Sequence, residues 1–256
     1  MQKLALMATG LALLVACQKS DNSLNRVSDI GLLVKQVDKI GQDSMVTEYF
    51  YDASDRLIEE KTRLRTVKYT RDQAGKIINI SSVGHMSDLS PDIDTIVVDV
   101  IYRSNGVVHM LSDSSIEYIH DGVGRITRTN YFAKPGDAEP ETYGLWSYDA
   151  TGNLQNVFFY KKGSTGSNDY NIAYSFEYDN RVNPQLSADN VLLPFKWGLA
   201  VSPNNLTRQV TFYGANNLTV DQNNIVYTYK STGVPETSEF NSTAVQGTKF
   251  TTYYYQ

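Results

Sequence analysis

The sequence predicts an all-β protein, formed as a single antiparallel meander of many β-hairpins in a strongly twisted or curled sheet. Three observations support this prediction: 18 of the 256 residues are Tyr, apolar side chains alternate with polar ones, and a turn pattern that begins with Tyr-Asp recurs. Tyr is enriched in strands, and alternation with period two describes strands that have one buried and one solvated face. Strands of this kind favour antiparallel pairing.

The first segment, residues 1–16, has the layout of an export signal. Lys3 is followed by an uncharged apolar run from Leu4 to Val15, which is the arrangement of a signal peptide. A helix that crosses a bilayer needs about 20 apolar residues, and this run is shorter. We therefore expect the segment to be removed on export.

The end of this segment, Leu14-Val15-Ala16-Cys17, resembles the lipobox of bacterial lipoproteins. The resemblance implies diacylglyceryl transfer to the Cys17 thiol, cleavage after Ala16 and acylation of the new N-terminus. An ordinary secretory signal with an accidental cysteine is the alternative, but Cys17 is the only cysteine of the chain. Because two or more acyl chains hold a protein stably on a bilayer, the membrane is an expected partner through Cys17.

Residues 17–30 are polar and are predicted to form a flexible tether. Their start, Gln18-Lys19-Ser20-Asp21, resembles a degraded form of the surface-export signal of Bacteroidetes-type lipoproteins, which usually has two acidic residues where this chain has Ser20 and Asp21. The resemblance implies an outer-membrane protein and favours the cell surface over the periplasmic face. The net charge of −5 is spread without blocks, so no nucleic-acid partner is expected.

Residues 31–256 are predicted to form one all-β domain of more than about ten strands. Clear alternation occurs in Leu154–Tyr160, Tyr174–Tyr178 and Ile225–Tyr229. The charged stretch Asp55–Lys68 also alternates and is predicted as strand rather than helix. No segment after Val15 keeps a helical period over three turns.

The turns between strands are more specific than the strands themselves. In Tyr148-Asp149-Ala150-Thr151-Gly152-Asn153, the Asp carboxylate can accept hydrogen bonds from backbone N–H groups further on, and Gly152 supplies a positive φ. Variants of the pattern occur at Tyr51–Leu57, Tyr69–Ile77, Tyr102–Val107, His120–Ile126, Tyr178–Arg181 and Tyr229–Val234. We expect hairpin tips at Gly75, Gly124, Gly152 and Gly233. Asp55 takes the glycine position in the first copy, since Asp tolerates left-handed backbone.

These turns resemble the YD repeat of Rhs-type proteins, whose core is Tyr-Asp, two variable residues, Gly, Arg and an aliphatic residue. A closer resemblance is to Bacteroidetes-type lipoproteins that have a YD-like domain of unknown function. It rests on the segments Leu33–Val37, Thr47–Asp52, Phe176–Asn180, Asn183-Pro184 and Ser202–Asn205. The resemblance implies an envelope lipoprotein and no particular activity.

Two stretches depart from the hairpin pattern. Residues 180–205 contain three prolines and apolar residues that include Trp197, and such a loop can be a lid or can plug one open end of the sheet. The stretch from Gly84 to Asp94 contains Asp88 and Asp92. It lacks the glycine and the terminal Glu of a calcium loop, so a solvated acidic loop is favoured.

No catalytic or metal-binding pattern is present in the sequence. His85, His109 and His120 are far apart and lack zinc-ligand spacing. There is no Gly-x-Ser-x-Gly elbow and no phosphate-binding loop. We therefore expect no catalytic residues, no metal and no cofactor, and the protein is not expected to be an enzyme.

Three functions stay open. The first is a non-catalytic envelope lipoprotein that binds a glycan, peptide or protein through an aromatic sheet face. The second is a structural scaffold whose aromatic residues only form cross-strand pairs, and the third is a hydrolase with an unrecognised site. Period-two geometry places the candidate binding residues on one face: Trp146, Tyr148, Tyr174, Phe176 and Tyr178, with Trp197 able to fold over them. The alternative is that these residues form the core under a capping loop.

Overall fold

The computed structural model describes residues 31–84, 95–164, 169–184, 202–214, 218–244 and 247–256. Their regular structure is entirely strand, and no helix among them is long and apolar enough to cross a membrane. The strands are β1 (Leu33–Ile40), β2 (Asp43–Tyr51), β3 (Leu57–Lys61), β4 (Arg65–Arg71), β5 (Ile77–Gly84), β6 (Thr95–Arg103), β7 (Gly106–Met110), β8 (Ser115–His120), β9 (Ile126–Phe132), β10 (Thr142–Tyr148), β11 (Leu154–Lys161), β12 (Ile172–Val182), β13 (Asn204–Tyr213), β14 (Leu218–Tyr229), β15 (Pro235–Ser242) and β16 (Lys249–Tyr255).

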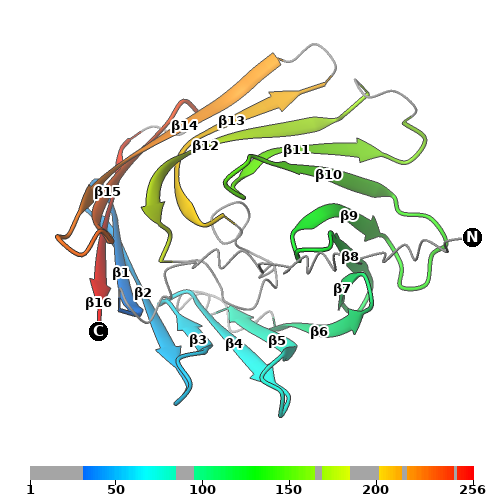
Figure 1. The fold of residues 1–256 in the computed structure, drawn as a ribbon, viewed down its shortest axis with the longest axis horizontal. Helices are drawn as coiled ribbons and strands as arrows, with labels where there is room; N and C mark the ends of the chain where they lie inside the picture. The colour runs from blue at the N-terminus through cyan, green and yellow to red at the C-terminus, as the bar shows by residue number, and fades with distance from the viewer. Residues whose placement is uncertain (1–30, 85–94, 165–168, 185–201, 215–217, 245–246) are drawn as a thin grey trace, which may run out of the picture.

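The sixteen strands form a closed barrel in sequence order (Figure 1). Consecutive strands pair antiparallel, which confirms the predicted meander. The expected twisted or curled sheet needs correction, because β1 also pairs with β16, from Leu33↔Tyr255 to Ile40↔Lys249. Closure leaves none of the described strands with an unpaired edge, and this removes the row of open backbone groups that an open sheet would expose.

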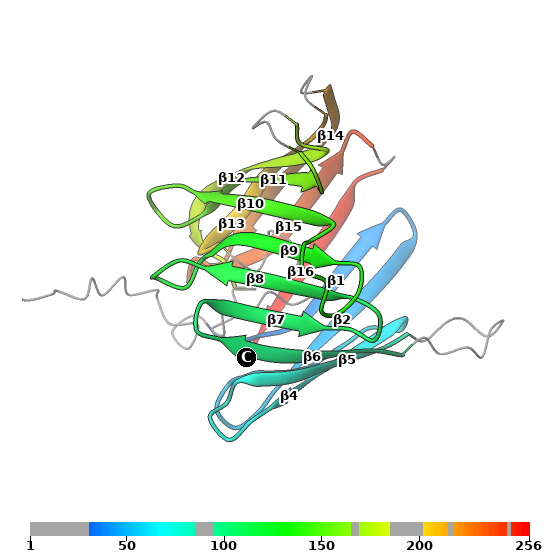
Figure 2. The ribbon, with the colours of Figure 1, turned by 90° about the vertical axis from the view of Figure 1, so that its right-hand side faces the viewer.

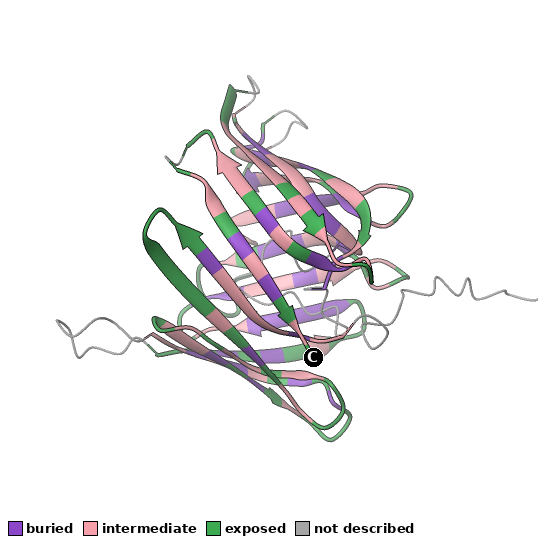
Figure 3. Ribbon diagram, turned by 90° about the vertical axis from the view of Figure 1, so that its left-hand side faces the viewer, coloured by how far each residue is buried: buried purple, intermediate pink, exposed green. Residues whose placement is uncertain are grey.

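Successive side chains point alternately into and out of the barrel. Buried and exposed positions alternate along the strands of the wall shown in Figure 3. Val67 and Tyr69, for example, are buried in the interior, whereas Lys68 between them is exposed. The inner face therefore supplies the core, as the sequence periodicity predicts.

Three apolar clusters pack inside the barrel. They are Val67, Tyr69, Ile77, Ile80, Val98, Val100 and Val107; Tyr118, Ile126, Trp146, Leu154, Val157, Phe176 and Leu206; and Leu33, Tyr49 and Tyr253. The second cluster, with Ile225 packed against it, joins side chains of adjacent strands from β8 to β14.

The outer face carries charges in the middle of its strands. Ion pairs link Lys68 to Glu59 on neighbouring strands at 3.7 Å and Arg208 to Glu177 at 2.6 Å. An aromatic group also packs on this face: Tyr143, Phe158, Tyr160, Tyr170 and Phe212 around Ala173. The outer face also exposes Val97, Ile101, Val226 and Phe250, so the outside of the barrel is a mixed surface.

The Tyr-Asp turns have the predicted conformation. Gly75, Gly124, Gly152 and Gly233 have φ of 86°, 87°, 89° and 88°, and Asp55 has φ of 59°. In the turn that follows Tyr148, Asp149 Oδ1 accepts hydrogen bonds from the backbone N–H groups of Thr151 and Asn153, both at 2.9 Å. Asp52 and Asp121 form the same two bonds to their own turns.

All seven copies of the turn lie at one end of the barrel, because each joins an even-numbered strand to the next strand. Figure 2 shows this for β6–β7 and β8–β9, whose hairpins turn at the same side. We call this the motif end and the opposite one the far end. The copies are irregularly spaced in the sequence, but each follows a strand that runs in the same direction. They therefore gather at one end of the barrel.

The stretch Asp55–Lys68 is not one strand, as predicted, but the hairpin of β3 and β4. Thr62 forms the turn: its Oγ1 accepts from the Leu64 N–H at 3.2 Å, and its own N–H donates to the Arg65 carbonyl at 2.8 Å. A threonine hydroxyl can stabilise a turn without glycine or proline. The sequence therefore shows no turn residue, and the alternation of side chains continues through the turn.

Candidate ligand-binding site

The interior at the motif end is closed by tyrosines that bond to the backbone of neighbouring strands. The Tyr51 hydroxyl donates to the Leu33 carbonyl at 2.7 Å, and the Tyr255 hydroxyl donates to the Pro235 carbonyl at 2.9 Å. The Tyr229 hydroxyl donates to the Asp179 carboxylate. Burial raises the pKa of each of these tyrosines, so they remain neutral donors.

Asp179 belongs to the copy that runs into the long loop. It keeps the turn bond from the Arg181 N–H, at 2.8 Å, but takes its second backbone bond from Asn205 across the loop, at 3.1 Å. The two ends of the loop are therefore tied to the motif end. The interior of the loop, including Trp197, lies outside the described residues, as do Cys17, Asp88, Asp92 and Asp94.

The interior at the far end is open to solvent. Tyr213 and Leu218 face each other in register, on the inner face, yet they are 49% and 64% exposed. Ile40 and Met45 are also exposed inward-facing residues near this end. The barrel is thus a cup that is closed at the motif end and accessible from the far end.

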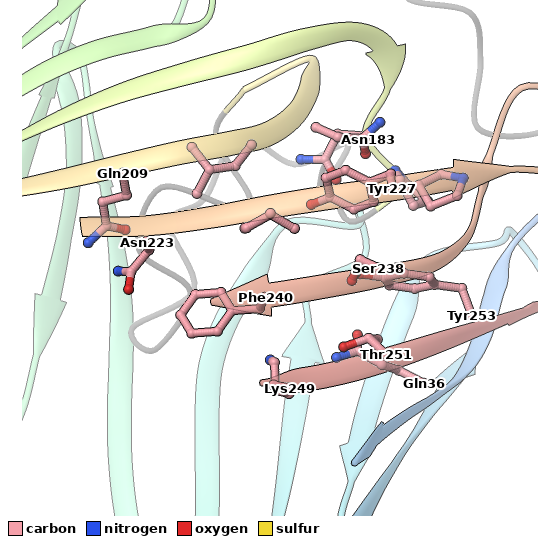
Figure 4. A pocket seen from close by; sticks show the side chains of 15 residues that line it. Gln36, Asn183, Gln209, Asn223, Tyr227, Ser238, Phe240, Lys249, Thr251 and Tyr253 are labelled. Atoms are coloured by element: carbon pink, nitrogen blue, oxygen red, sulfur yellow. The ribbon is translucent and has the colours of Figure 1, made fainter. Parts of the chain in front are cut away.

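A polar cavity of about 150 Å³ lies along the inner wall, from Lys249 near the far end to Asn183 and Pro235 at the motif end (Figure 4). Its wall is built from β1 and β13 to β16, with contributions from the segment after β12. Amides, hydroxyls, one ammonium group and aromatic rings share its lining: Gln36, Asn183, Asn205, Gln209, Asn223, Ser238, Thr251, Lys249, Tyr227, Phe240 and Tyr253. Burial raises the pKa of Tyr253 to about 12, so its hydroxyl stays protonated.

A buried carboxylate, Asp38, organises one side of this pocket. It accepts from the Thr251 hydroxyl at 2.6 Å and from Gln36 Nε2 at 3.1 Å, and Lys249 Nζ lies 3.7 Å away. The hydrogen bonds and the Lys249 ammonium group compensate the negative charge of Asp38 within the wall. Lys249 also lies over the Phe240 ring, at 5.5 Å from its centroid, which fixes the ammonium group beside the cavity.

A second carboxylate, Asp221, orients the other side. Burial alone would raise the pKa of Asp221, but hydrogen bonds from Ser242, Thr243 and Ala244 lower it below its usual range. Asn223 lies two residues further along the same strand, and its Oδ1 is buried without a hydrogen-bond partner among the described residues.

The aromatic residues predicted as a binding face gather on the inner wall, but they pack as core. Trp146 and Phe176 are buried, and Tyr148, Tyr174 and Tyr178 pack against the same cluster. The Trp146 indole N–H donates to the Thr129 hydroxyl at 3.3 Å. Tyr148, Tyr174 and Tyr178 are only half-buried, so a binding role for this face stays a prediction. The polar pocket is the candidate site that we describe.

The pocket residues were not predicted from the sequence, although a signal for them was present. Asp221 and Asn223 are at alternate positions of the same strand as Ile225, Tyr227 and Tyr229. All five side chains therefore point to the inner face. Polar residues at positions that periodicity assigns to the core are unusual and mark candidate sites. The sequence prediction used only the aromatic residues of the inner face and did not include the polar residues on that face.

Within the described ranges, no group of three or more His, Cys, Asp or Glu side chains is arranged to hold a metal ion. His109 and His120 are described, and His85 is not. The pocket itself contains neutral amides and hydroxyls with a single ammonium group, which is chemistry for binding by hydrogen bonds.

Comparisons with known proteins give structural neighbours only. No family model matches the chain, and no curated protein matches it. A porin-like protein from Bacteroides uniformis is similar in structure, with a TM-score of 0.44 and 11% identity, over 88% of this chain and 96% of that one. A porin-like protein from Bacteroides vulgatus has a TM-score of 0.44 and 12% identity, over 88% of this chain and 99% of that one.

Proposed function

We propose that the protein is a non-catalytic envelope lipoprotein that binds a small polar ligand inside its barrel. The observation that carries this proposal is the pocket around Asn223 and Lys249, in which polar groups converge on a concave surface with aromatic walls. β-Barrels with one closed end and one accessible end commonly hold ligands in this position.

We further propose that lipid on Cys17 attaches the barrel to the outer membrane, on the cell-surface side, and that the barrel lies outside the hydrocarbon layer. A barrel that spans a bilayer presents an apolar band to the lipid. Here, the ion pairs Lys68–Glu59 and Arg208–Glu177 lie on the outer face in mid-strand. Burying such charges in hydrocarbon would cost several kcal/mol each.

A purely structural scaffold is the competing proposal. It accounts for the tyrosine-rich clusters, because packed aromatic residues stabilise the barrel without any ligand. It does not account for the polar side chains Gln209, Asn223 and Lys249 that line the cavity on the inner face, since polar residues are unusual at positions that periodicity assigns to the core.

The pocket can be tested by saturation-transfer NMR on the mature protein with a panel of neutral monosaccharides, uronic acids, amino acids and dipeptides. We expect at least one class to give a signal that disappears in Gln209→Trp, which fills the cavity from β13. The control is Asn224→Trp, which places the same side chain on the outer face of β14 and should keep the signal. If no probe gives a signal that Gln209→Trp removes, the binding function is wrong.

The anchor can be tested separately. Mass spectrometry of membrane-fraction protein should find a mature chain that begins at acylated Cys17, and Cys17→Ala should release the protein or stall its processing. Ser20→Ala, three residues further on, should remain attached. A Cys17→Ala protein that is correctly trimmed and still membrane-bound would contradict lipid anchoring.

A further inference from the structure

The chain enters and leaves the barrel at the motif end, and this determines where a lipid anchor would act. The Leu32 N–H donates to the Gln256 carbonyl at 3.2 Å, and the Gln256 N–H donates to the Leu32 carbonyl at 3.1 Å. These two bonds extend the pairing of β1 with β16 at the end where β2 turns into β3. A lipid on Cys17, as proposed above, would therefore pull on the motif end, and the inference below rests on that anchor.

The tether is short compared with the barrel. Fourteen residues, 17–30, precede the first described residue, Gly31, and a polar chain of this length spans roughly 20 Å on average. The longest strand, β14, has 12 residues, which at about 3.3 Å per residue and a tilt of about 40° makes the barrel roughly 30 Å tall. To place the far end on the bilayer, the tether would have to run the whole length of the wall.

A layer of basic groups covers the tyrosines of the motif end. The pairs are Lys76 over Tyr102, Arg125 over Tyr148, Arg181 over Tyr229 and Lys230 over Tyr255, at 4.9, 5.0, 5.7 and 5.1 Å from the ring centroids. The ring covers one side of each cation. Lys76, Arg125 and Arg181 are nevertheless exposed, so their other side can meet a phosphate group.

Most acidic groups of the same turns lie deeper. Asp121, Asp149 and Asp179 are half-buried, because each carboxylate accepts hydrogen bonds from the backbone of its own turn. Only Asp55 and Asp72 of the Tyr-Asp turns are exposed acids, and the three exposed cations outnumber them. An anionic surface that approaches the motif end therefore meets basic groups within a Debye length, about 8–10 Å.

One turn tip is apolar. Val123, in the turn between β8 and β9, is 74% exposed, which is the largest value among the exposed large apolar side chains of the described residues. Its N–H donates to Asp121 at 3.0 Å, so the turn holds the side chain outward. A single aliphatic group beside cations suits the boundary between headgroups and acyl chains.

We propose that the motif end is the membrane-facing surface of the lipidated protein. Its turn tips lie against the anionic headgroups of the bilayer that holds the lipid of Cys17, with Lys76, Arg125, Arg181 and Lys230 next to the phosphates. The far end then opens away from the bilayer, so a ligand enters the barrel from the solvent side.

The orientation can be tested because the acylated protein has no free thiol, Cys17 being the only cysteine. Single exposed alanines are available at both ends: Ala74 and Ala150 in motif turns, and Ala138 between β9 and β10 at the far end. Each is changed to Cys, labelled with a fluorophore and placed, as acylated full-length protein, in vesicles of phosphatidylcholine, phosphatidylglycerol and a lipid with a spin-labelled headgroup. The spin label quenches only at close approach. We expect the labels at Ala74→Cys and Ala150→Cys to lose most of their fluorescence, and the label at Ala138→Cys to keep it.

The other outcomes separate the orientation from the anchor. Quenching at Ala138→Cys alone, equal quenching at all three positions, or quenching at none would overturn the orientation. The anchor would remain intact if mass spectrometry finds acylated Cys17 in the same sample. A chain without acyl groups on Cys17 would refute both.

The basic groups are tested by the double variant Lys76→Gln, Lys230→Gln. Each lysine near an anionic bilayer contributes a factor of roughly five to the attraction. The variant should therefore weaken quenching at Ala150→Cys in vesicles that contain phosphatidylglycerol, and should not change it in vesicles of phosphatidylcholine alone. The matched control is Lys134→Gln, Lys162→Gln at the far end, which should keep the quenching. Unchanged quenching in the motif-end variant would refute the contact with anionic headgroups.

Discussion

The two ends of the barrel interior are built from different chemistry. At the motif end, tyrosines such as Tyr51 and Tyr255 fill the interior and bond to neighbouring strands. Toward the far end, the inner face carries Asn223 and Lys249, which line a cavity that extends along the wall, and Asp38 lies beside Lys249. Both ends belong to the same strands, so the change from apolar to polar occurs along each strand rather than between domains.

This difference teaches how the barrel separates stability from binding. Apolar burial stabilises the closed end, and the hydrogen bonds of Tyr51 and Tyr255 add to this. The open end contains a buried acceptor without a partner among the described residues, together with a solvent-exposed rim. Such features contribute little to folding and are typical of functional sites. Substitutions at the two ends should therefore have different effects on the free energy of unfolding.

The largest contrast is expected between truncations of inward-facing residues at the two ends. Leu154 is 0% exposed at the centre of an interior cluster, so Leu154→Ala should lower the free energy of unfolding by about 3 kcal/mol through lost burial and a cavity. Gln209 lines the polar pocket, so Gln209→Ala should lower the free energy of unfolding by less than about 0.5 kcal/mol. Urea unfolding measures both, and equal costs would contradict the division of the interior.

A pH-dependent loss of stability is expected from His109, which packs edge-on against Tyr118 in the barrel interior. It is 1% exposed, and burial lowers its pKa from 6.5 to about 4. The folded protein therefore keeps His109 neutral, while the unfolded chain binds a proton below pH 6.5. The free energy of unfolding is therefore unaffected by His109 above pH 6.5. It decreases as the pH falls from 6.5 to 4, by about 3 kcal/mol in total.

The control for this prediction is His109→Phe, which keeps an aromatic ring in place and has no titratable group. Urea unfolding between about pH 7 and pH 4 should show a smaller loss of stability for the variant than for the unaltered protein. Lowered carboxylate pKa values, such as that of Asp149, contribute to both proteins and cancel in the difference. Identical pH dependence in the two proteins would show that His109 is not the source.

A smaller effect is expected from the turns that close the motif end. Gly152 has φ of 89°, and no atom lies within 4 Å of the position that a Cβ would take there. Gly152→Val should therefore cost about 1–2 kcal/mol through left-handed strain alone. Gly122 lies in an equivalent turn, also has open space, and does not have a positive φ. Gly122→Val should be close to neutral in thermal unfolding, and equal losses would disprove the strain argument.

Much of the motif end could be predicted from the sequence because its determinants are local. The Asp149 turn needs only residues within one hairpin, and period two assigns Trp146 and Phe176 to one face. Closure could not be predicted, since the pairing of Leu33 with Tyr255 depends on the number and tilt of all strands between them. The pocket was missed because Gln36 and Asn223 come from distant strands that only closure brings to one cavity.

The smallest effect on stability is expected at Lys249, where the effect on binding should be large. Lys249 is partly exposed, and its distance of 3.7 Å from Asp38 is long for an ion pair, so Lys249→Met should change the free energy of unfolding by less than about 1 kcal/mol. Asp38 keeps its hydrogen bonds from Thr251 and Gln36, which prevents a larger loss. A residue that contributes to binding but little to folding should lose affinity without losing thermal stability, and urea unfolding beside saturation-transfer NMR measures both. A decrease of several kcal/mol in the free energy of unfolding would instead show that Lys249 stabilises the fold. It would contradict the division between a stabilising end and a binding end.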